Sequence, residues 1–273
     1  KDLVCQWALV AHTLVTDYPA RQAFRYDELG NALNDEWGRR LVYDSVGRLQ
    51  EVRDADDDDQ VLASYRYDGH DQLYAARYGT AAEVLRRYQG NQVDRTVQDG
   101  LLTHYLYQNE MALGLNQWRG DQLQDSRLLL SDAQGTVLAE YDADGLRPKQ
   151  EATGELHPTT YSAYGERPED NGLRTLLGFL GELRDELFGW YMLGRGYRAY
   201  NPSLMRFHSP DSLAPEESGI NPYLYCLGDP VNWRDPTGHR SAYGYGKENP
   251  TDRSYHPPYI DPIERPKGGW AQW

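Results

Sequence analysis

Cysteine and long apolar runs are scarce in this sequence. Only two cysteines, Cys5 and Cys226, occur in 273 residues. That is too few for a disulfide scaffold, and we expect two buried thiols rather than one long-range disulfide. No stretch approaches the ~18 consecutive apolar residues that a membrane-spanning helix needs. Polar residues such as Gln6 and His12 interrupt the first 15 positions, and no clear cleavage site follows, so no signal peptide is visible.

Positive charge is also in short supply. The chain holds 28 Lys and Arg against 42 Asp and Glu, which gives a formal net charge of −14. Nucleic acids and anionic membranes repel such a chain, and no run rich in Lys or Arg offsets this repulsion. Neither is therefore an expected partner.

The usual signatures of metal, nucleotide and nucleophile sites are missing. The seven histidines form no H-x-x-x-H pair and no zinc spacing with cysteine. No G-x-S-x-G occurs, and GYGKENP (244–250) lacks the second half of a phosphate loop. The acidic run DADDDD (54–59) fails as an EF-hand, because Asp59 takes the glycine position and Tyr65 the closing glutamate position. We expect no metal and no cofactor, and we interpret the acidic run as a solvated loop.

Tyrosine, glycine and proline are abundant instead, with 22, 26 and 15 residues. Mean hydropathy is −0.80, but tyrosines suit half-buried sheet faces, so this low value does not indicate disorder. A unit recurs in which an alternating strand ends in Tyr-Asp and a glycine often follows. Its copies are FRYDELGNAL (24–33), LVYDSVGRLQEV (41–52), YRYDGHDQLYAARY (65–78) and AEYDADGLR (139–147), with degenerate copies at 87–97 and 130–141.

Each unit predicts one β-hairpin. The tyrosine ring packs on one face of the strand, the aspartate bonds the backbone two residues on, and the glycine supplies the positive φ of a short turn. A hairpin of this kind buries one face only beside its neighbours. The sequence therefore predicts an all-β fold, a long curved antiparallel sheet whose edges are exposed unless other segments continue it.

The chain divides into four parts on pattern. They are a lead-in (1–19), the repeat region (20–172), a turn-rich core segment (173–239) and an irregular tail (240–273). Within the repeat region, 146–172 is polar and is interpreted as an excursion or linker. At the start of the core segment, 173–193 fits one short helix or β-structure about equally well. Because residue 1 is lysine, we expect a fragment, a processed product or a trimmed chain.

The repeats and the core segment together resemble the Rhs, or YD-repeat, family. Residues 176–239 are similar to its Rhs-repeat-associated core, whose pattern runs approximately G-x-R-Y-Y-x-P-x-x-x-R-F-x-S-P-D and then N-x-Y-x-Y-x-x-x-x-P-x-N-x-x-D-P-x-G. The resemblance covers roughly residues 20–239. It implies a hollow β-cage of YD hairpins, as in Rhs polymorphic toxins and the C components of Tc toxins, with the core closing one end.

The resemblance also implies partners and an activity. Many members are aspartic autoproteases that cut just after D-P-x-G-L/M and keep a C-terminal toxin inside the cage until delivery. Expected partners are further YD-repeat sequence completing the cage, an effector or its immunity protein, and a secretion apparatus or Tc-type channel. The chain would be made in the cytoplasm and then secreted or delivered by a bacterial toxin system.

Three residues carry over by position: Arg198, Asp211 in S-P-D and Asp235 in D-P-x-G. Two adjacent carboxylates can share one proton, so that one serves as general base and the other as general acid, while an arginine holds one of them ionised. The simpler interpretation is that both aspartates open turns and the arginine is their structural partner. Cleavage would fall in the region of Gly238, His239 and Arg240.

The sequence departs from the family pattern where cleavage is expected. His239 takes the position of leucine or methionine, Met205 that of glycine, and Ala199 that of a tyrosine. Only 34 residues follow His239, so the tail would be a remnant, a non-enzymatic region or a very small effector. The alternative function is a non-catalytic YD-repeat adhesion or interaction protein, whose exposed tyrosines would bind carbohydrate or a protein partner.

Overall fold

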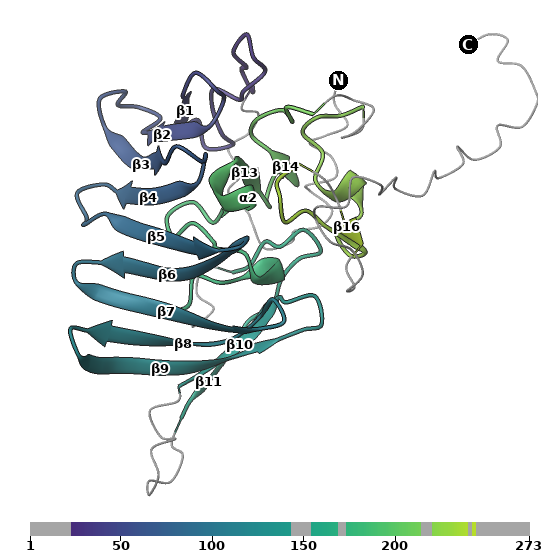
Figure 1. The fold of residues 1–273 in the computed structure, drawn as a ribbon. Helices are drawn as coiled ribbons and strands as arrows, with labels where there is room; N and C mark the ends of the chain where they lie inside the picture. Colours follow the sequence, from purple (N-terminus) through teal and green to yellow (C-terminus); the bar gives the residue numbers. More distant parts are fainter. Residues whose placement is uncertain (1–22, 143–153, 169–172, 214–219, 240–241, 244–273) are drawn as a thin grey trace, which may run out of the picture.

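The computed structural model describes residues 23–142, 154–168, 173–213, 220–239 and 242–243. Its main element is an eleven-stranded antiparallel sheet with the strands in chain order, β1 to β11 (Figure 1). The strands are β1 Arg40–Tyr43, β2 Leu49–Arg53, β3 Val61–Tyr67, β4 Leu73–Tyr78, β5 Val84–Gln89, β6 Gln92–Gln98, β7 Leu101–Gln108, β8 Met111–Arg119, β9 Gln122–Ser131, β10 Val137–Asp142 and β11 Leu156–Pro158. The predicted all-β, open and curved sheet is confirmed.

The aspartates of the repeats build the turns as predicted. In the turns that begin at Asp27, Asp44, Asp68 and Asp132, one carboxylate oxygen accepts the backbone N–H groups two and four residues on, at 2.8–3.0 Å. The third residue after the aspartate has a positive φ in each turn. It is a glycine in three of them and Asp71 in the turn at Asp68. The aspartate thus binds N–H groups that would otherwise lack a partner in the turn.

The repeat tyrosines fill wedges between neighbouring hairpins. Tyr67, Tyr88 and Tyr107 donate their hydroxyls to the carbonyls of Leu49, Leu73 and Val93, at 2.8, 3.0 and 3.0 Å. The strands separate at these points: β6 and β7 pair only between Arg95↔His104 and Gln98↔Leu101. Each hydroxyl therefore satisfies a carbonyl near the place where the ladder has opened. The tyrosine of the Tyr-Asp unit lets the sheet splay and curve without orphaned backbone groups.

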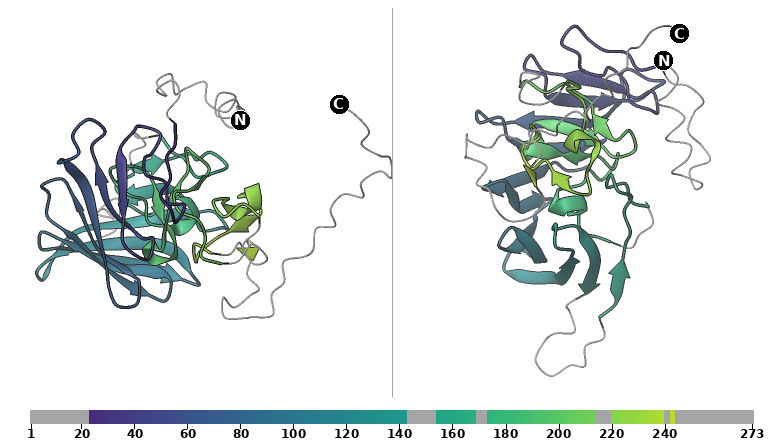
Figure 2. Two further views of the ribbon diagram at one scale, coloured as in Figure 1. Left: turned by 90° about the horizontal axis from the view of Figure 1, so that it is seen from above. Right: turned by 90° about the vertical axis from the view of Figure 1, so that its right-hand side faces the viewer.

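The core segment packs against one face of the curved sheet (Figure 2). Trp190, Met192 and Ala199 join a buried cluster with side chains of β1 to β4. Leu177 and Leu183 join a second cluster with side chains of β6 to β10. The face that the repeats would otherwise leave exposed is thus covered by the same chain, which removes apolar surface from water.

One buried aspartate clamps the core segment to the sheet. Asp185, which is fully buried, accepts hydrogen bonds from the hydroxyls of Tyr65 and Tyr78, both at 2.8 Å. Its other oxygen accepts the N–H groups of Leu187 and Phe188, both at 3.0 Å. Four donors satisfy this carboxylate, which is the condition for keeping a buried charge in a fold.

The core segment itself consists of short strands and turns. β12 Tyr191–Met192, β13 Arg198–Asn201 and β14 Arg206–Phe207 form one small sheet, and β15 Trp233–Arg234 pairs with β16 Ala242–Tyr243. The 3-10 turns η2 Phe179–Gly181 and η3 Cys226–Gly228 and the single helical turn α2 Leu193–Gly196 complete it. The sequence left one short helix and β-structure as alternatives for residues 173–193. The helix is not formed, because Leu180 has a positive φ and backbone bridges link 177 to 183 and 184 to 191.

The predicted polar excursion at 146–172 is wrong in part. β11, within this stretch, pairs with β10 and adds an eleventh strand to the sheet. Three residues are too short for periodicity to reveal a strand. The lead-in and most of the tail lie outside the described residues, as do Cys5 and Arg240, whereas Cys226 is buried. No helix among the described residues has the length and apolar character to cross a membrane.

The wedge role of the tyrosines predicts the effect of removing one hydroxyl. Tyr107→Phe keeps the ring but leaves the Val93 carbonyl without its donor, so we expect a loss of about 1 kcal/mol in the free energy of unfolding. Urea titration measures this loss. Tyr26→Phe is the matched control, because Tyr26 is 45% exposed. Equal effects of the two substitutions would contradict the wedge role.

Candidate functional site

The site is organised around Arg198, the first residue of β13. All four residues of this strand are buried, and the Arg198 side chain is 3% exposed. Its guanidinium lies over the ring of Phe207 in the neighbouring strand β14, with the central carbon 3.6 Å from the ring centroid. The aromatic face offsets part of the cost of burying the charge and fixes the plane of the guanidinium.

Three segments of the chain converge on this guanidinium. Its Nη2 donates to Asp211 Oδ2 at 2.9 Å, and its Nη1 donates to the carbonyl of Pro222 at 3.0 Å. Its Nε donates to the carbonyl of Gly238. The donors of one fixed, planar group therefore hold the S-P-D turn, the segment before Tyr223 and the D-P-T-G turn together.

Asp211 is held by its own backbone as well as by Arg198. Its N–H donates to the Pro222 carbonyl at 3.1 Å, and its Oδ1 accepts the N–H of Leu213 at 3.0 Å. The side chain is 2% exposed. The charge-assisted bond to Arg198 offsets the cost of burying this carboxylate.

Asp235 opens a turn of the same design as the repeat turns. Its Oδ1 accepts the N–H of His239, four residues on, at 3.0 Å, and Gly238, three residues on, has a φ of +70°. A side chain at 238 is disfavoured both by this φ and by Tyr197, whose ring carbon would lie 3.2 Å from an added Cβ. With Oδ1 engaged in the turn, Oδ2 faces Arg198 Nη2 at 3.7 Å.

Burial sets the protonation of this group. Desolvation raises the pKa of Asp235 above its ordinary value, and the nearby charge of Asp211 raises it further, while Arg198 opposes both. Burial also lowers the pKa of Arg198 from its ordinary value, against the attraction of the two carboxylates, yet an arginine this basic stays charged. The raised pKa disposes Asp235 to carry a proton.

His239 closes the site. The sequence marked it as part of the cleavage region and as a departure from the family pattern, but gave no sign of its contact with Asp211. Its Nδ1 lies 2.8 Å from Asp211 Oδ1, and its ring stacks on Tyr197 at 3.8 Å between centroids. The hydroxyl of Tyr197 accepts the N–H of Ser212, beside Asp211. The structure thus brings Arg198, Asp211 and Asp235 together with Gly238 and His239, over sequence separations of up to 41 positions.

A further carboxyl, Glu182, lies near the dyad and had no sequence signal. Burial raises the pKa of Glu182 to about 8, and the charge of Asp235 contributes to this shift. Glu182 follows the turn η2, which packs against Tyr191 at the heart of the core segment. Its position depends on tertiary packing, because nothing in the local sequence indicates that this glutamate is partly buried.

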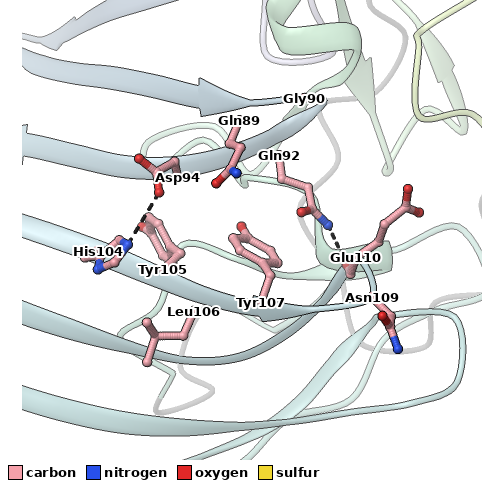
Figure 3. Close-up of a pocket in the computed structure, with 10 residues that line it drawn as sticks. All are labelled: Gln89, Gly90, Gln92, Asp94, His104, Tyr105, Leu106, Tyr107, Asn109 and Glu110. Carbon is pink, nitrogen blue, oxygen red and sulfur yellow. Dashed lines mark hydrogen bonds and ion pairs between the residues drawn. The ribbon is translucent and has the colours of Figure 1, made fainter.

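A hollow of about 540 Å³ lies apart from the dyad, between β6 and β7 (Figure 3). It occupies the wedge where the two strands separate. At its rim Gln92 Nε2 donates to the Glu110 carbonyl at 2.6 Å, and His104 Nε2 lies 3.4 Å from Asp94 Oδ1. Glu110 also pairs with Arg234, the residue before Asp235, at 3.3 Å. The hollow follows from the curvature of the sheet.

The comparisons with known proteins show the fold. No family model and no curated protein matches the chain. Among solved structures, the Tc holotoxin pore of Photorhabdus luminescens with a TccC3 substitution matches at a TM-score of 0.54 and 18% identity, over 82% of this chain and 11% of that one. A TcdB2–TccC3 crystal structure matches at a TM-score of 0.51 and 19% identity, over 78% and 11%. The chain spans about a tenth of these toxin chains and has their Rhs-type fold.

The shifted carboxyl predicts a pH-dependent stability difference. The folded chain binds the Glu182 proton more tightly than the unfolded chain, whose glutamate titrates near 4.5. Stability is therefore lost as pH rises from about 4.5 to about 8, and Glu182→Gln abolishes this loss. In thermal unfolding at pH 4.5, 6.5 and 8.5, the Tm of the variant relative to that of the wild type should increase with each step in pH. Glu28→Gln, at an exposed site, is the control, and a gap that stays constant with pH would contradict the assignment.

Proposed function

We propose that this chain is the C-terminal part of an Rhs-type encapsulating shell, with an aspartic self-cleavage site at the end of its core segment. The observation that carries the proposal is the buried group of Arg198, Asp211 and Asp235, in which Arg198 also binds the carbonyl of Gly238 in the cleavage region. The Rhs-type fold shared with Tc toxin chains supports the shell role.

The chemistry assigns one role to each residue. Asp211 acts as general base and takes a proton from water, whose oxygen bonds to the carbonyl carbon of the scissile peptide. Asp235 acts as general acid and gives its proton to the leaving nitrogen as the C–N bond breaks. Arg198 positions Asp211 and the D-P-T-G turn. One water is consumed, and a new carboxyl and a new amine are formed.

The substrate in this mechanism is the chain itself. Asp235 and the cleavage region belong to one turn, so the peptide to be cut is delivered to the dyad by folding, at high effective concentration. A binding cleft for a separate substrate is therefore unnecessary. The segment released after His239 would be the tail, which we assign as the cargo or as the remnant of a C-terminal effector.

The shell role requires further strands. The core segment covers the inner face of this sheet through the clusters of Trp190 and Leu177, so space for cargo must come from strands beyond this chain. Within the described residues, β11 pairs with one strand of the sheet only, whereas Leu33 and Asn34 bond to the outer side of β1. The β11 edge is a template for strand addition. We assign it to further YD-repeat sequence or a partner shell chain, and delivery to a secretion or Tc-type system.

The shell assignment is tested by mixing this chain with a YD-repeat shell chain and measuring mass in solution by sedimentation. Leu156 is 52% exposed on β11, and a proline there disturbs the edge strand. A complex that forms with the wild type but not with Leu156→Pro supports strand addition at this edge. Leu123→Pro is not a usable control, since β9 is an inner strand. Ile220→Pro, at a position outside the sheet that is 96% exposed, serves instead. A chain that remains alone under all conditions contradicts the assignment.

Self-cleavage is tested by intact mass. We expect the 31.3 kDa chain to lose its C-terminal segment of about 34 residues, and Asp235→Asn to abolish the loss because the general acid is gone. The wild-type rate should fall once the pH exceeds the raised pKa of Asp235, since the protonated form is then depleted. Asp229→Asn is the matched control, because Asp229 also precedes a proline and binds its own turn at Asn232.

Cleavage that persists in Asp235→Asn would remove this residue from the mechanism. An unchanged mass at every pH between 4 and 9, in the wild type and in variants of the cleavage region alike, would overturn self-cleavage altogether.

A further inference from the structure

We propose that the side chain of His239 is a built-in brake on self-cleavage, which it exerts by occupying the catalytic oxygen of Asp211. This inference rests on the proposed self-cleavage and concerns how it is regulated. The brake belongs to this chain, because it depends on a histidine where the resemblance expects leucine or methionine. It would tie release of the tail to pH.

The contacts of Asp211 leave little room for water. Its Oδ2 is bound to Arg198 at 2.9 Å, and its Oδ1 accepts the N–H of Leu213 at 3.0 Å and lies 2.8 Å from His239 Nδ1. With its side chain 2% exposed and three of about four acceptor positions already in contact with donors, Asp211 has little capacity left to accept a hydrogen bond from a water that bridges to Asp235. A general base must lie within hydrogen-bond reach of the proton that it removes, so the imidazole competes directly with the attacking water.

The contact with Asp211 is not a by-product of the turn. The bond from the His239 N–H to Asp235 recurs in the repeat turns, where an N–H four residues on also binds the aspartate. The side-chain contact has no such counterpart, since it joins residues 28 positions apart. Stacking on Tyr197 at 3.8 Å, with the rings inclined by 26°, holds the imidazole in this orientation.

Charge makes the brake sensitive to pH. The titratable and charged groups around the imidazole are Asp211, Asp235, Arg198 and the phenol of Tyr197. A neutral imidazole donates one ordinary hydrogen bond to Asp211, whereas an imidazolium forms a charge-assisted bond of roughly twice the strength. The His239 side chain is 31% exposed, so protons reach it. Protonation of the imidazole therefore tightens the brake.

The test compares the cleavage rates of the full-length wild type and His239→Leu by intact mass at pH 5.5, 6.5, 7.5 and 8.5. Leucine is apolar, cannot bond Asp211, and matches the residue type expected at this position. We expect His239→Leu to be cleaved about tenfold faster or more at pH 5.5, which corresponds to the loss of one charge-assisted hydrogen bond. The ratio should shrink toward pH 8.5. Because Asp235 titrates in both proteins, the ratio isolates the contribution of His239.

Two further variants separate the brake from other effects of substitution. His239→Gln keeps a neutral donor, so we expect it to slow cleavage relative to His239→Leu by an amount that is the same at every pH. His104→Leu is the matched control, because His104 also pairs with an aspartate, Asp94, but lies on β7 away from the dyad. It should be cleaved at the wild-type rate. The double variant Asp235→Asn with His239→Leu should not be cleaved.

The outcomes separate the two proposals. The brake is supported if His239→Leu is cleaved faster than the wild type and the ratio of the two rates falls as the pH rises. It is also supported if His239→Leu is cleaved and the wild type is not. Equal or slower cleavage of His239→Leu leaves self-cleavage intact and overturns the brake. If neither protein is cleaved at any pH, self-cleavage is wrong and the brake falls with it.

Discussion

The core segment depends on one interaction, the burial of the Arg198 guanidinium against Phe207. A buried cation must be neutralised and its N–H groups bonded. Asp211, the Pro222 carbonyl and the Gly238 carbonyl meet that demand from three separate segments. The same requirement that stabilises the fold therefore assembles the carboxylate pair. Loss of Arg198 would leave the Asp211 carboxylate buried without its countercharge, so structure and proposed chemistry cannot be separated at this residue.

The repeats supply a surface for the core segment more than an enclosure. Their tyrosines bridge the wedges between hairpins, and the curvature that results presents Tyr65 and Tyr78 to the buried carboxylate of Asp185. The inner face is then filled by Trp190 and Leu177 and their neighbours. In the proposed shell, the strands of this chain would form the closed end, and a cavity for cargo would lie along the strands that continue the sheet.

The turn at Asp235 has the hydrogen bonds of a repeat turn but a more buried aspartate, to which we assign a role in the proposed cleavage. In the repeat turns the aspartate binds its own backbone, as Asp44 does, and is at least partly exposed to solvent. At Asp235 one oxygen keeps that role, but burial beside Arg198 and Asp211 raises the pKa of the group and turns the other oxygen toward the dyad. The turn places the N–H of His239 on Asp235, whereas the contacts of its ring with Tyr197 and Asp211 depend on tertiary packing.

The sequence by itself determined the hairpins, because a Tyr-Asp turn is a local device whose partners lie within four residues of the aspartate. It also marked Arg198, Asp211 and Asp235, through the resemblance of the core segment. Only the tertiary structure decided that these three meet, that the partly buried Glu182 lies near Asp235, that β11 joins the sheet, and that 173–193 is not a helix. These features depend on packing between segments far apart in the chain. The contact of His239 with Asp211 is of this kind, since nothing within a few residues of either one specifies the other.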